Sequence, residues 1–414
     1  ARLPGVNAMA AGPLSTLSVN NTKDARMKTL LVLVTAVTFA FSARADELAD
    51  ANQLFDFAEK TYAKYFSPAG QTTQTLQGYL VRYYPDTNSY LGTSGGSVYV
   101  HGQQFGVGII RVGNVTDFIT PATGAANTVV DLTNRILTRR AANCSDFAGS
   151  YQGTAQDFAR NLSFTGNLAI AVSNGSCTFT SNNIPNHTMG EGGACATPVS
   201  AQNSNFRMTA SPSAAAQTSA LGLTWNSGVL LNGVRIDMFA AACFGVGDGK
   251  IGCNNESQPW RYDPMSPKNK FGTDIHNAHT QPDGAYHYHG NPKTLFDFSK
   301  IVESPVVGFA ADGFPLFGSY FKDQAGNVRK ARSSYQLKSG SRPSGSGNPG
   351  GVYDGTYRDD YEFVSGLGDL DSCNGMTVNG IYGYYITDEF PYMTNCFRGT
   401  PDTSFRKGGG GAPR

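Results

Sequence analysis

Charged residues are scarce in this chain. Only 15% of its residues are Asp, Glu, Lys or Arg, and 32 basic side chains stand against 31 acidic ones. A nucleic-acid interface needs clustered cations to displace counterions from phosphates, so this balance argues against nucleic acid as a partner. Disorder is disfavoured because Tyr and Phe are abundant and supply area that folding can bury. Helical bundles are poor in Gly, whereas this chain has 49, so we expect a mainly β protein.

The sequence also lacks the short motifs of several enzyme classes. No H-E-x-x-H and no G-x-x-x-x-G-K-[ST] occurs, so neither a zincin helix nor a P-loop is indicated. No C-x-x-C occurs, which argues against a thiolate zinc site or a redox dithiol. Residues 92–96 formally match G-x-S-x-G, but they lead into a β run rather than a helix and therefore indicate a turn.

Apolar runs long enough to cross a bilayer are absent. The run from Thr29 to Ser42 is shorter than the roughly 20 residues that a spanning helix needs. It follows Met27-Lys28 and precedes Ala43-Arg44-Ala45, an order that predicts a secretory signal peptide over 27–45. Residues 1–26 are then an upstream extension, and the mature chain starts at Asp46. We expect a periplasmic or extracellular protein without a transmembrane anchor.

Export makes disulfides permissible for the seven cysteines. Pairing each cysteine with its neighbour leaves Cys195 over and gives three bridges: Cys144–Cys177, Cys243–Cys253 and Cys373–Cys396. The sequence does not prove this pattern, because roughly 105 arrangements of three bridges and one leftover cysteine exist. The role of Cys195 stays open.

Three modules are expected along the mature chain. Residues 46–120 combine a helical pattern with strand-like runs at 78–84, 90–92 and 97–101, and loosely resemble a helix-and-hairpin module of exported bacterial proteins. Residues 121–217 read as a linker and a small β unit stapled by Cys144–Cys177. Residues 218–399 form a larger β-rich domain, and 400–414 a flexible tail. The expected fold class is therefore mainly β and multi-module, with an α+β module at the N-terminus.

Histidine is rare, yet four of the six histidines lie between positions 276 and 289. Residues 282–284 (Pro-Asp-Gly) predict a turn, and the alternating Tyr-His-Tyr-His after it predicts a strand. His287 and His289 then share one face, and Tyr286 and Tyr288 share the other. His279, just across the turn, could supply a third nitrogen. A fourth histidine, His276, is a candidate ligand or supporting group.

Three imidazoles with an open coordination position suit a transition metal such as Cu or Zn. The alternative is a structural strand of histidines and tyrosines in which each ring donates a hydrogen bond to a carbonyl. Calcium stays an option through loops of Asp and Asn, although no D-x-[DN]-x-[DN]-G loop occurs.

The stretch from Gln281 to Gly290 resembles the signature of the YHYH-domain family of exported proteins. Further segments fit the same family, at 231–234, 276–279, 308–315, 370–375 and 389–392. The resemblance covers residues of about 218–399. It implies a secreted domain with a metal or ligand site, and it brings no settled reaction with it.

An internal repeat is also visible. Residues 284–289 (Gly-Ala-Tyr-His-Tyr-His) are echoed by residues 380–385 (Gly-Ile-Tyr-Gly-Tyr-Tyr). Both copies read as a turn followed by a strand, which predicts two related sheets or a pseudo-symmetric β fold. In the second copy Gly383 and Tyr385 stand at the histidine positions. We therefore expect one metal site, near His279, His287 and His289.

Asp312 is a candidate catalytic residue. A carboxylate beside a metal can act as a ligand, orient a histidine, or serve as general base on metal-bound water. The simpler interpretation of Asp312-Gly313 is an ordinary turn.

Three functions remain open at this point. The first is an exported protein that binds Cu or Zn for metal handling or ligand presentation. The second is a metal-dependent hydrolase, in which Asp312 assists. The third is an adhesion or carbohydrate-binding module without metal, with an exposed Tyr face as a stacking platform. The small-molecule or surface ligand is not identified by the sequence.

The pairing of Cys373 with Cys396 is directly testable. We expect this bridge to staple the hairpin that closes the large domain. Mass spectrometry of non-reduced peptides should recover the two cysteines in one linked peptide. Finding either thiol free, or bonded to another cysteine, would refute the pairing.

Overall fold

The computed structural model describes Phe55, Glu59, five short ranges between 71 and 112, and most of 129–407. The five ranges are 71–76, 79–84, 89–94, 97–102 and 106–112, and the gaps after residue 129 are 192–196, 248, 250, 270 and 298–301. The expected signal peptide, Cys195 and residues 408–414 lie outside the described residues. Within them, the named elements are strands and three short 3-10 helices.

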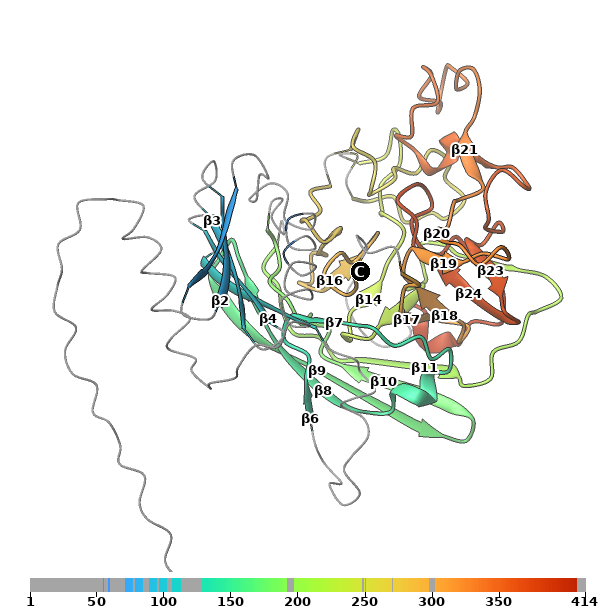
Figure 1. The fold of residues 1–414 in the computed structure, drawn as a ribbon. Coiled ribbons are helices and arrows are strands. Elements are labelled where there is room, and N and C mark those ends of the chain that lie inside the picture. Colours follow the sequence, from blue (N-terminus) through green and yellow to red (C-terminus); the bar gives the residue numbers. More distant parts are fainter. Residues whose placement is uncertain are drawn as a thin grey trace, which may run out of the picture.

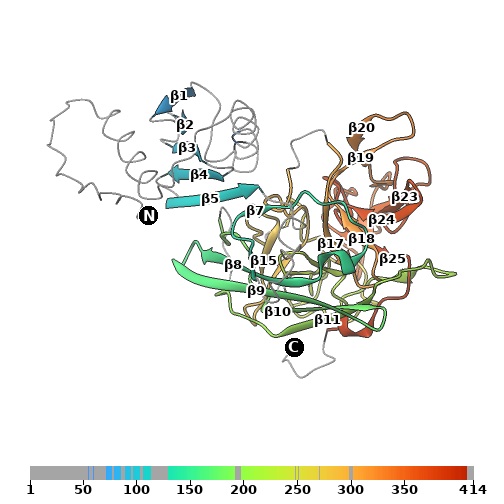
Figure 2. The same cartoon turned by 60° about the horizontal axis from the view of Figure 1, so that its bottom comes forward.

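The N-terminal part is a six-stranded sheet in the order β1-β2-β3-β4-β5-β7 (Figures 1 and 2). Its strands are β1 (Thr72–Leu76), β2 (Tyr79–Tyr84), β3 (Ser89–Ser94), β4 (Ser97–Gly102), β5 (Gly106–Val112) and β7 (Arg135–Ile136). The three strand runs expected from the sequence are confirmed as β2, β3 and β4. The sheet is larger than the expected hairpin. An α+β module is not supported, because the helical pattern expected ahead of the strands in 46–120 falls almost wholly outside the described residues.

A second sheet has five strands in the order β11-β10-β9-β8-β6. These are β6 (Val129–Asp131), β8 (Gly149–Asp157), β9 (Leu162–Ser173), β10 (Ser176–Ser181) and β11 (Ser204–Thr209). Buried and exposed residues alternate along β8 and β9, as expected for a sheet with one face on a core. The short helix η1 (Cys144–Phe147) is joined to β10 by the Cys144–Cys177 disulfide.

The largest sheet has eight strands in the order β15-β16-β14-β13-β17-β18-β24-β23. Its strands are β13 (Gly228–Leu230), β14 (Arg235–Ile236), β15 (Ala278–Thr280), β16 (Tyr286–Tyr288), β17 (Val306–Ala310), β18 (Pro315–Phe317), β23 (Gly375–Val378) and β24 (Ile381–Tyr385). The β14–β16 and β18–β24 pairs are parallel, and the other neighbours are antiparallel. The sheet therefore consists of two four-stranded halves with the same connectivity, related by a pseudo-twofold axis between β13 and β17.

Glycines occupy equivalent positions beside that axis. A Cβ on Gly228 would lie 2.5 Å from the carbonyl oxygen of Phe309, and one on Gly308 would lie 2.6 Å from that of Val229. Only glycine allows the two central strands to approach so closely.

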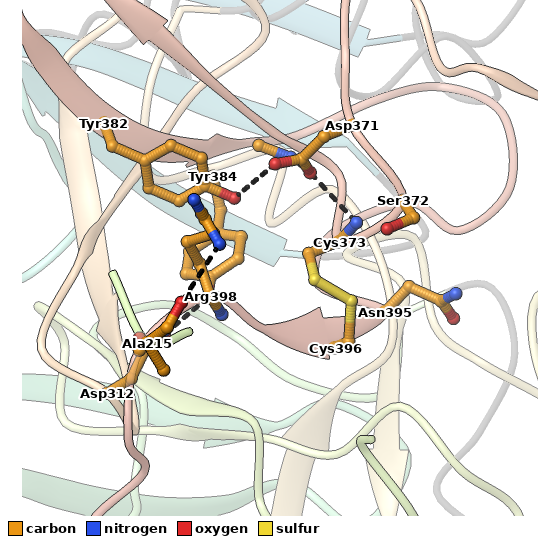
Figure 3. Close-up of a disulfide and its surroundings, with 12 residues drawn as sticks. Ala215, Asp312, Asp371, Ser372, Cys373, Tyr382, Tyr384, Asn395, Cys396 and Arg398 are labelled. Carbon is orange, nitrogen blue, oxygen red and sulfur yellow. Dashed lines mark hydrogen bonds between the residues drawn. A yellow bond between two sulfur atoms is a disulfide. The ribbon is translucent and has the colours of Figure 1, made fainter. Parts of the chain in front are cut away.

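The two halves share their local hydrogen bonds as well as their order. Asp274 accepts a bond from the Tyr286 hydroxyl (2.7 Å) and from the backbone N–H groups two and four residues later. Asp371 does the same with the Tyr382 hydroxyl (2.9 Å) and with its own two backbone donors (Figure 3). Asn277 and Asn374 both take left-handed backbone conformations, with φ of 60° and 68°. The repeat predicted from the sequence is thus a structural duplication within one sheet.

The remaining strands form two-stranded pairs: β12 (Ser219–Ala220) with β25 (Cys396–Phe397), β19 (Tyr320–Lys322) with β20 (Val328–Lys330), and β21 (Tyr335–Leu337) with β22 (Tyr361–Phe363). Helix η2 spans Arg358–Asp360. Helix η3 (Thr403–Phe405) falls in the stretch expected as a tail. Its Phe405 is fully buried and stacks on Phe206 of β11, with ring centroids 4.5 Å apart.

A single cluster of buried side chains runs from Val130 to Phe405 and joins the five-stranded and eight-stranded sheets. Rings from both sheets meet in it, as Phe179 of β10 and Phe309 of β17 show with centroids 6.1 Å apart. The Cys243–Cys253 and Cys373–Cys396 disulfides are present, so all three bridges follow the neighbour pairing. Among the described residues, no helix combines the length and apolar character needed to cross a bilayer.

The duplicated tyrosine–aspartate bonds can be tested as a matched pair. Tyr286→Phe and Tyr382→Phe should each lower the free energy of unfolding by about 1–3 kcal/mol, because each leaves a carboxylate oxygen short of a donor. The larger loss is expected for Tyr286, since it is completely buried. Urea unfolding followed by fluorescence measures both.

Tyr353→Phe is the control for this pair. Tyr353 is half-buried and packs its ring beneath Lys338, so the change should stay within about 0.5 kcal/mol. Equal stability of all three variants and the unmodified protein would contradict a structural role for the two bonds.

Candidate metal centre

Three histidines from the β15–β16 hairpin converge on one face of the large sheet. His279 in β15 lies directly opposite His287 in β16, and His289 follows two residues later. Residues opposite each other and residues two apart on one strand point to the same face. The Nε2 atom of His289 lies 2.9 Å from that of His287 and 3.1 Å from that of His279. The structure thus brings together the three histidines that the sequence pattern selected.

The outer ring nitrogens fix how two of these imidazoles are protonated. Nδ1 of His279 lies 3.2 Å from the carbonyl oxygen of Phe271, and Nδ1 of His287 lies 3.2 Å from that of Ala285. A carbonyl only accepts, so both Nδ1 atoms carry the proton and donate it. Both Nε2 atoms then present lone pairs to the centre of the cluster. Carbonyls that hold Nδ1–H in this way are the usual supports of metal-binding histidines.

His289, the third ring, cannot pair with both of the other Nε2 lone pairs, so one of them lacks a donor unless a cation is present. In a metal-free state the His289 Nε2–H group can donate well to only one of its two neighbours. A buried lone pair without a donor costs about 1–3 kcal/mol. A cation at the centre would serve all three nitrogens at once. Tetrahedral Zn with bonds of about 2.0–2.1 Å places its nitrogens about 3.3 Å apart, close to the 2.9 Å and 3.1 Å that separate the His289 Nε2 atom from the other two.

Burial keeps these histidines neutral. His287 and His289 are each only 2% exposed, and His279 is half-buried. Loss of hydration disfavours the imidazolium, so burial lowers the pKa of His279, and lowers the pKa of His287 and His289 well below their ordinary value. The other histidines of the cluster lower the pKa of His287 and His289 further. Neutral imidazole is the form that binds metals.

His276 does not join the three. Its Nε2 lies 3.2 Å from an oxygen of Glu191, and its ring packs on that of His187 with centroids 4.2 Å apart. His187 is bonded in turn to the hydroxyl of Tyr288. His276 therefore belongs to a buried network on the opposite face of β16. His187 belongs to the segment between β10 and β11, and only the fold brings it next to β16.

The tyrosine face of β16 is not exposed. Tyr286 and Tyr288 are both 0% exposed. The hydroxyl of Tyr288 accepts a bond from Asn232 (3.1 Å), as that of Tyr286 donates to Asp274. The expectation of an exposed stacking platform is wrong, because both rings are buried and His187, from the segment between β10 and β11, packs against them.

Asp312 lies in the other half of the sheet. It occupies the β17–β18 turn, where it accepts bonds from the Tyr384 hydroxyl (2.6 Å) and the Gly399 N–H (2.9 Å). Figure 3 shows this carboxylate beside Tyr384, in the half of the sheet that holds β24. Three strand steps separate β17 from β16, about 14 Å at the usual strand spacing. Burial raises the pKa of Asp312. Its carboxylate is held by Tyr384 and Gly399 and has a structural role in its own half of the sheet.

The second half of the sheet has no equivalent cluster. Met376 pairs with Gly383 where His279 pairs with His287, and Tyr385 stands in the place of His289. The ring of Tyr385 stacks on Phe317 (5.2 Å), and a Cβ on Gly383 would lie 2.5 Å from that phenylalanine. Packed aromatic rings therefore fill the volume that the histidines line in the first half. Within the described ranges, no second group of three His, Cys, Asp or Glu side chains converges in this way.

Four polar residues that sequence reasoning missed border the histidine cluster. Arg235 and Asp237 flank Ile236 of β14, which is in parallel register with Tyr288, so both share the histidine face. Gln281 links them, accepting from Arg235 (3.1 Å) and donating to Asp237 (2.7 Å). Lys407 reaches Asp237 at 2.5 Å. The alternation in Arg235-Ile236-Asp237 predicts that the two charged residues share one face of a strand. The pairing of β14 with β16, which brings them beside the histidines, does not follow from the sequence.

Comparison with known proteins gives one match. Residues 205–399 match the family model described as YHYH protein. No curated protein and no solved structure matches the chain.

The lowered histidine pKa values predict how stability responds to acid. As pH falls below about 6.5 the unfolded chain takes up protons at these rings, while the folded rings stay neutral. The free energy of unfolding therefore decreases as pH falls below about 6.5, and it stops decreasing once the pH reaches the lower pKa values of the folded rings. Each unit of lowering at each ring is worth about 1.4 kcal/mol. Thermal unfolding of metal-free protein between pH 7.5 and 5 measures the effect.

The comparison variant carries His287→Gln and His289→Gln. Glutamine does not titrate, so this variant should lose less stability over the same pH interval, whatever its stability at pH 7.5. An unchanged pH dependence would show that the two rings are not held neutral by the fold.

Proposed function

The chain carries a YHYH domain over residues 205–399, and we propose that this domain binds one Cu or Zn ion through the Nε2 atoms of His279, His287 and His289. The observation that supports this most is the convergence of three histidines, two buried and one half-buried, whose ligand nitrogens lie within 4.8 Å of one another. Nitrogen ligands suit Cu and Zn, whereas calcium prefers oxygen, so calcium does not fit this cluster.

The role that fits is metal handling or presentation of the ion to a ligand. Three protein nitrogens leave at least one coordination position for water or another molecule. Three disulfides agree with an oxidising compartment, and we place the protein outside the cytoplasm on that basis together with the expected signal peptide.

A hydrolase based on metal-bound water is the second candidate, and its open coordination position is the same. The assisting carboxylate would not be Asp312, which is bound to Tyr384 and Gly399 in the other half of the sheet. Asp237 is the carboxylate on the histidine face. A carbohydrate-binding role through Tyr286 and Tyr288 loses its basis, since both are buried.

Elemental analysis of the purified mature protein tests the metal. We expect close to one equivalent of Cu or Zn per chain, and a variant with His287→Ala and His289→Ala should retain less than about a tenth of it. At free metal 100 times its Kd, binding should also raise the free energy of unfolding by about 2.7 kcal/mol.

His276→Gln is the matched control from the same segment, because its ring faces Glu191 rather than the cluster. Asp312→Asn is a second control, from the other half. Both should keep the metal. A wild-type protein that binds neither Cu nor Zn, when offered either in excess, would sink the proposal.

A further inference from the structure

The histidine cluster is one end of a row of side chains that crosses three strands. In the order β15-β16-β14, His279 lies opposite His287, and Arg235 lies level with His287 because Ile236 is in register with Tyr288. Adjacent strands are about 4.8 Å apart, so the guanidinium stem starts one strand spacing from a candidate metal ligand.

The other charges beside the cluster neutralise one another. Asp237 is completely buried, and Lys407 donates to its Oδ2 atom at 2.5 Å. The amide of Gln281 donates to the same oxygen at 2.7 Å. The negative charge of Asp237 is therefore already neutralised by Lys407, and its oxygen has a second donor in Gln281. Asp237 does not neutralise the positive charge of Arg235.

Within the part of the chain that the structure describes, Arg235 itself lacks a close carboxylate. Its nearest one, Asp283, is 4.0 Å away and about a third exposed, which makes a weak pair. One Nη2 donor goes to the neutral amide of Gln281. Its Nε atom is buried and has no hydrogen-bond partner among the described residues. The Arg235 side chain is 15% exposed, and a half-buried guanidinium with donors to spare is a preorganised receptor for the two oxygens of a carboxylate or phosphate.

We infer that the molecule taken up at the open position of the metal centre is an oxyanion, a carboxylate or a phosphate, held by the metal through one oxygen and by Arg235 through another. This rests on the proposed function, because the ion supplies half of the binding. A divalent cation on three neutral imidazoles adds positive charge beside Arg235, which strengthens the preference for an anion. The inference gives the site a ligand class that the histidines alone do not specify.

Cobalt-loaded protein tests this, since the visible spectrum of tetrahedral Co2+ reports on a ligand entering its coordination sphere. The metal content and the Kd for Co2+ are measured first, before any anion is added. Acetate and inorganic phosphate are then titrated separately, so the two arms show which oxyanion the site prefers. We expect a saturable spectral change with at least one of them in the wild-type protein.

The decisive variant is Arg235→Gln, which should weaken anion binding at least tenfold while changing the Kd for Co2+ less than threefold. Arg235→Lys keeps the positive charge but loses the planar pair of guanidinium donors, so its anion affinity should lie between those of the wild type and Arg235→Gln. Arg207→Gln, at an exposed arginine of β11, is the matched control and should behave as wild type. Thermal unfolding verifies that each variant is folded. If Arg235→Gln does not fold, the comparison is made with Arg235→Lys instead.

The two ways of failing are distinct. Protein that takes up no metal in the first step contradicts the proposed function and the inference with it. Protein that binds Co2+ but shows no spectral response to either anion, or equal anion affinity in the Arg235 variants and the wild type, overturns the inference alone.

Discussion

The mutual register of β15 and β16 is the constraint on which the site depends. Because His279 lies opposite His287, and His289 follows two residues after His287, a slip of one residue between the two strands would put His279 on the opposite face from the other two rings. The turn that sets this register ends in Gly284, with φ of 81°, where a Cβ would lie 2.3 Å from the hydroxyl of Ser200. Asp274 fixes the other end of β15 by binding the backbone N–H of Ala278.

The face behind the histidines is as highly organised as the site itself. Tyr286 and Tyr288 alternate with the ligand candidates along β16, and each buried hydroxyl has a partner. Buried polar networks that are satisfied in this way rigidify a core, because any displacement leaves a group unpaired in a low-dielectric interior. The network beneath β16, with His187 among its members, therefore holds the histidine rings in position from the opposite side.

The two halves of the duplicated sheet have the same backbone arrangement but carry different side chains on one face. Both halves keep the aspartate turn, the left-handed asparagine and the paired tyrosines. In the first half the face beyond them carries histidines with Arg235 and Asp237. In the second, Phe317 and Tyr385 stack over Gly383, which must be glycine to admit the phenylalanine ring. The fold thus does not require the histidines, and their presence in one half is a property of the site.

The sequence by itself determined the local features: the β class, the repeat, and the three candidate histidines. Each rests on composition, on a recurring motif or on a periodicity of two, which the chain displays directly. The neighbour pairing of the disulfides was one of roughly 105 arrangements that the sequence left open, and the structure selected it. Only the tertiary structure decided that His276 faces Glu191, that Asp312 lies in the other half, that the tyrosines are buried, and that Arg235 stands beside His287. Those facts depend on which strands pair across gaps of 50 residues or more, and side-chain alternation shows which face a residue takes but not which strand lies next to it.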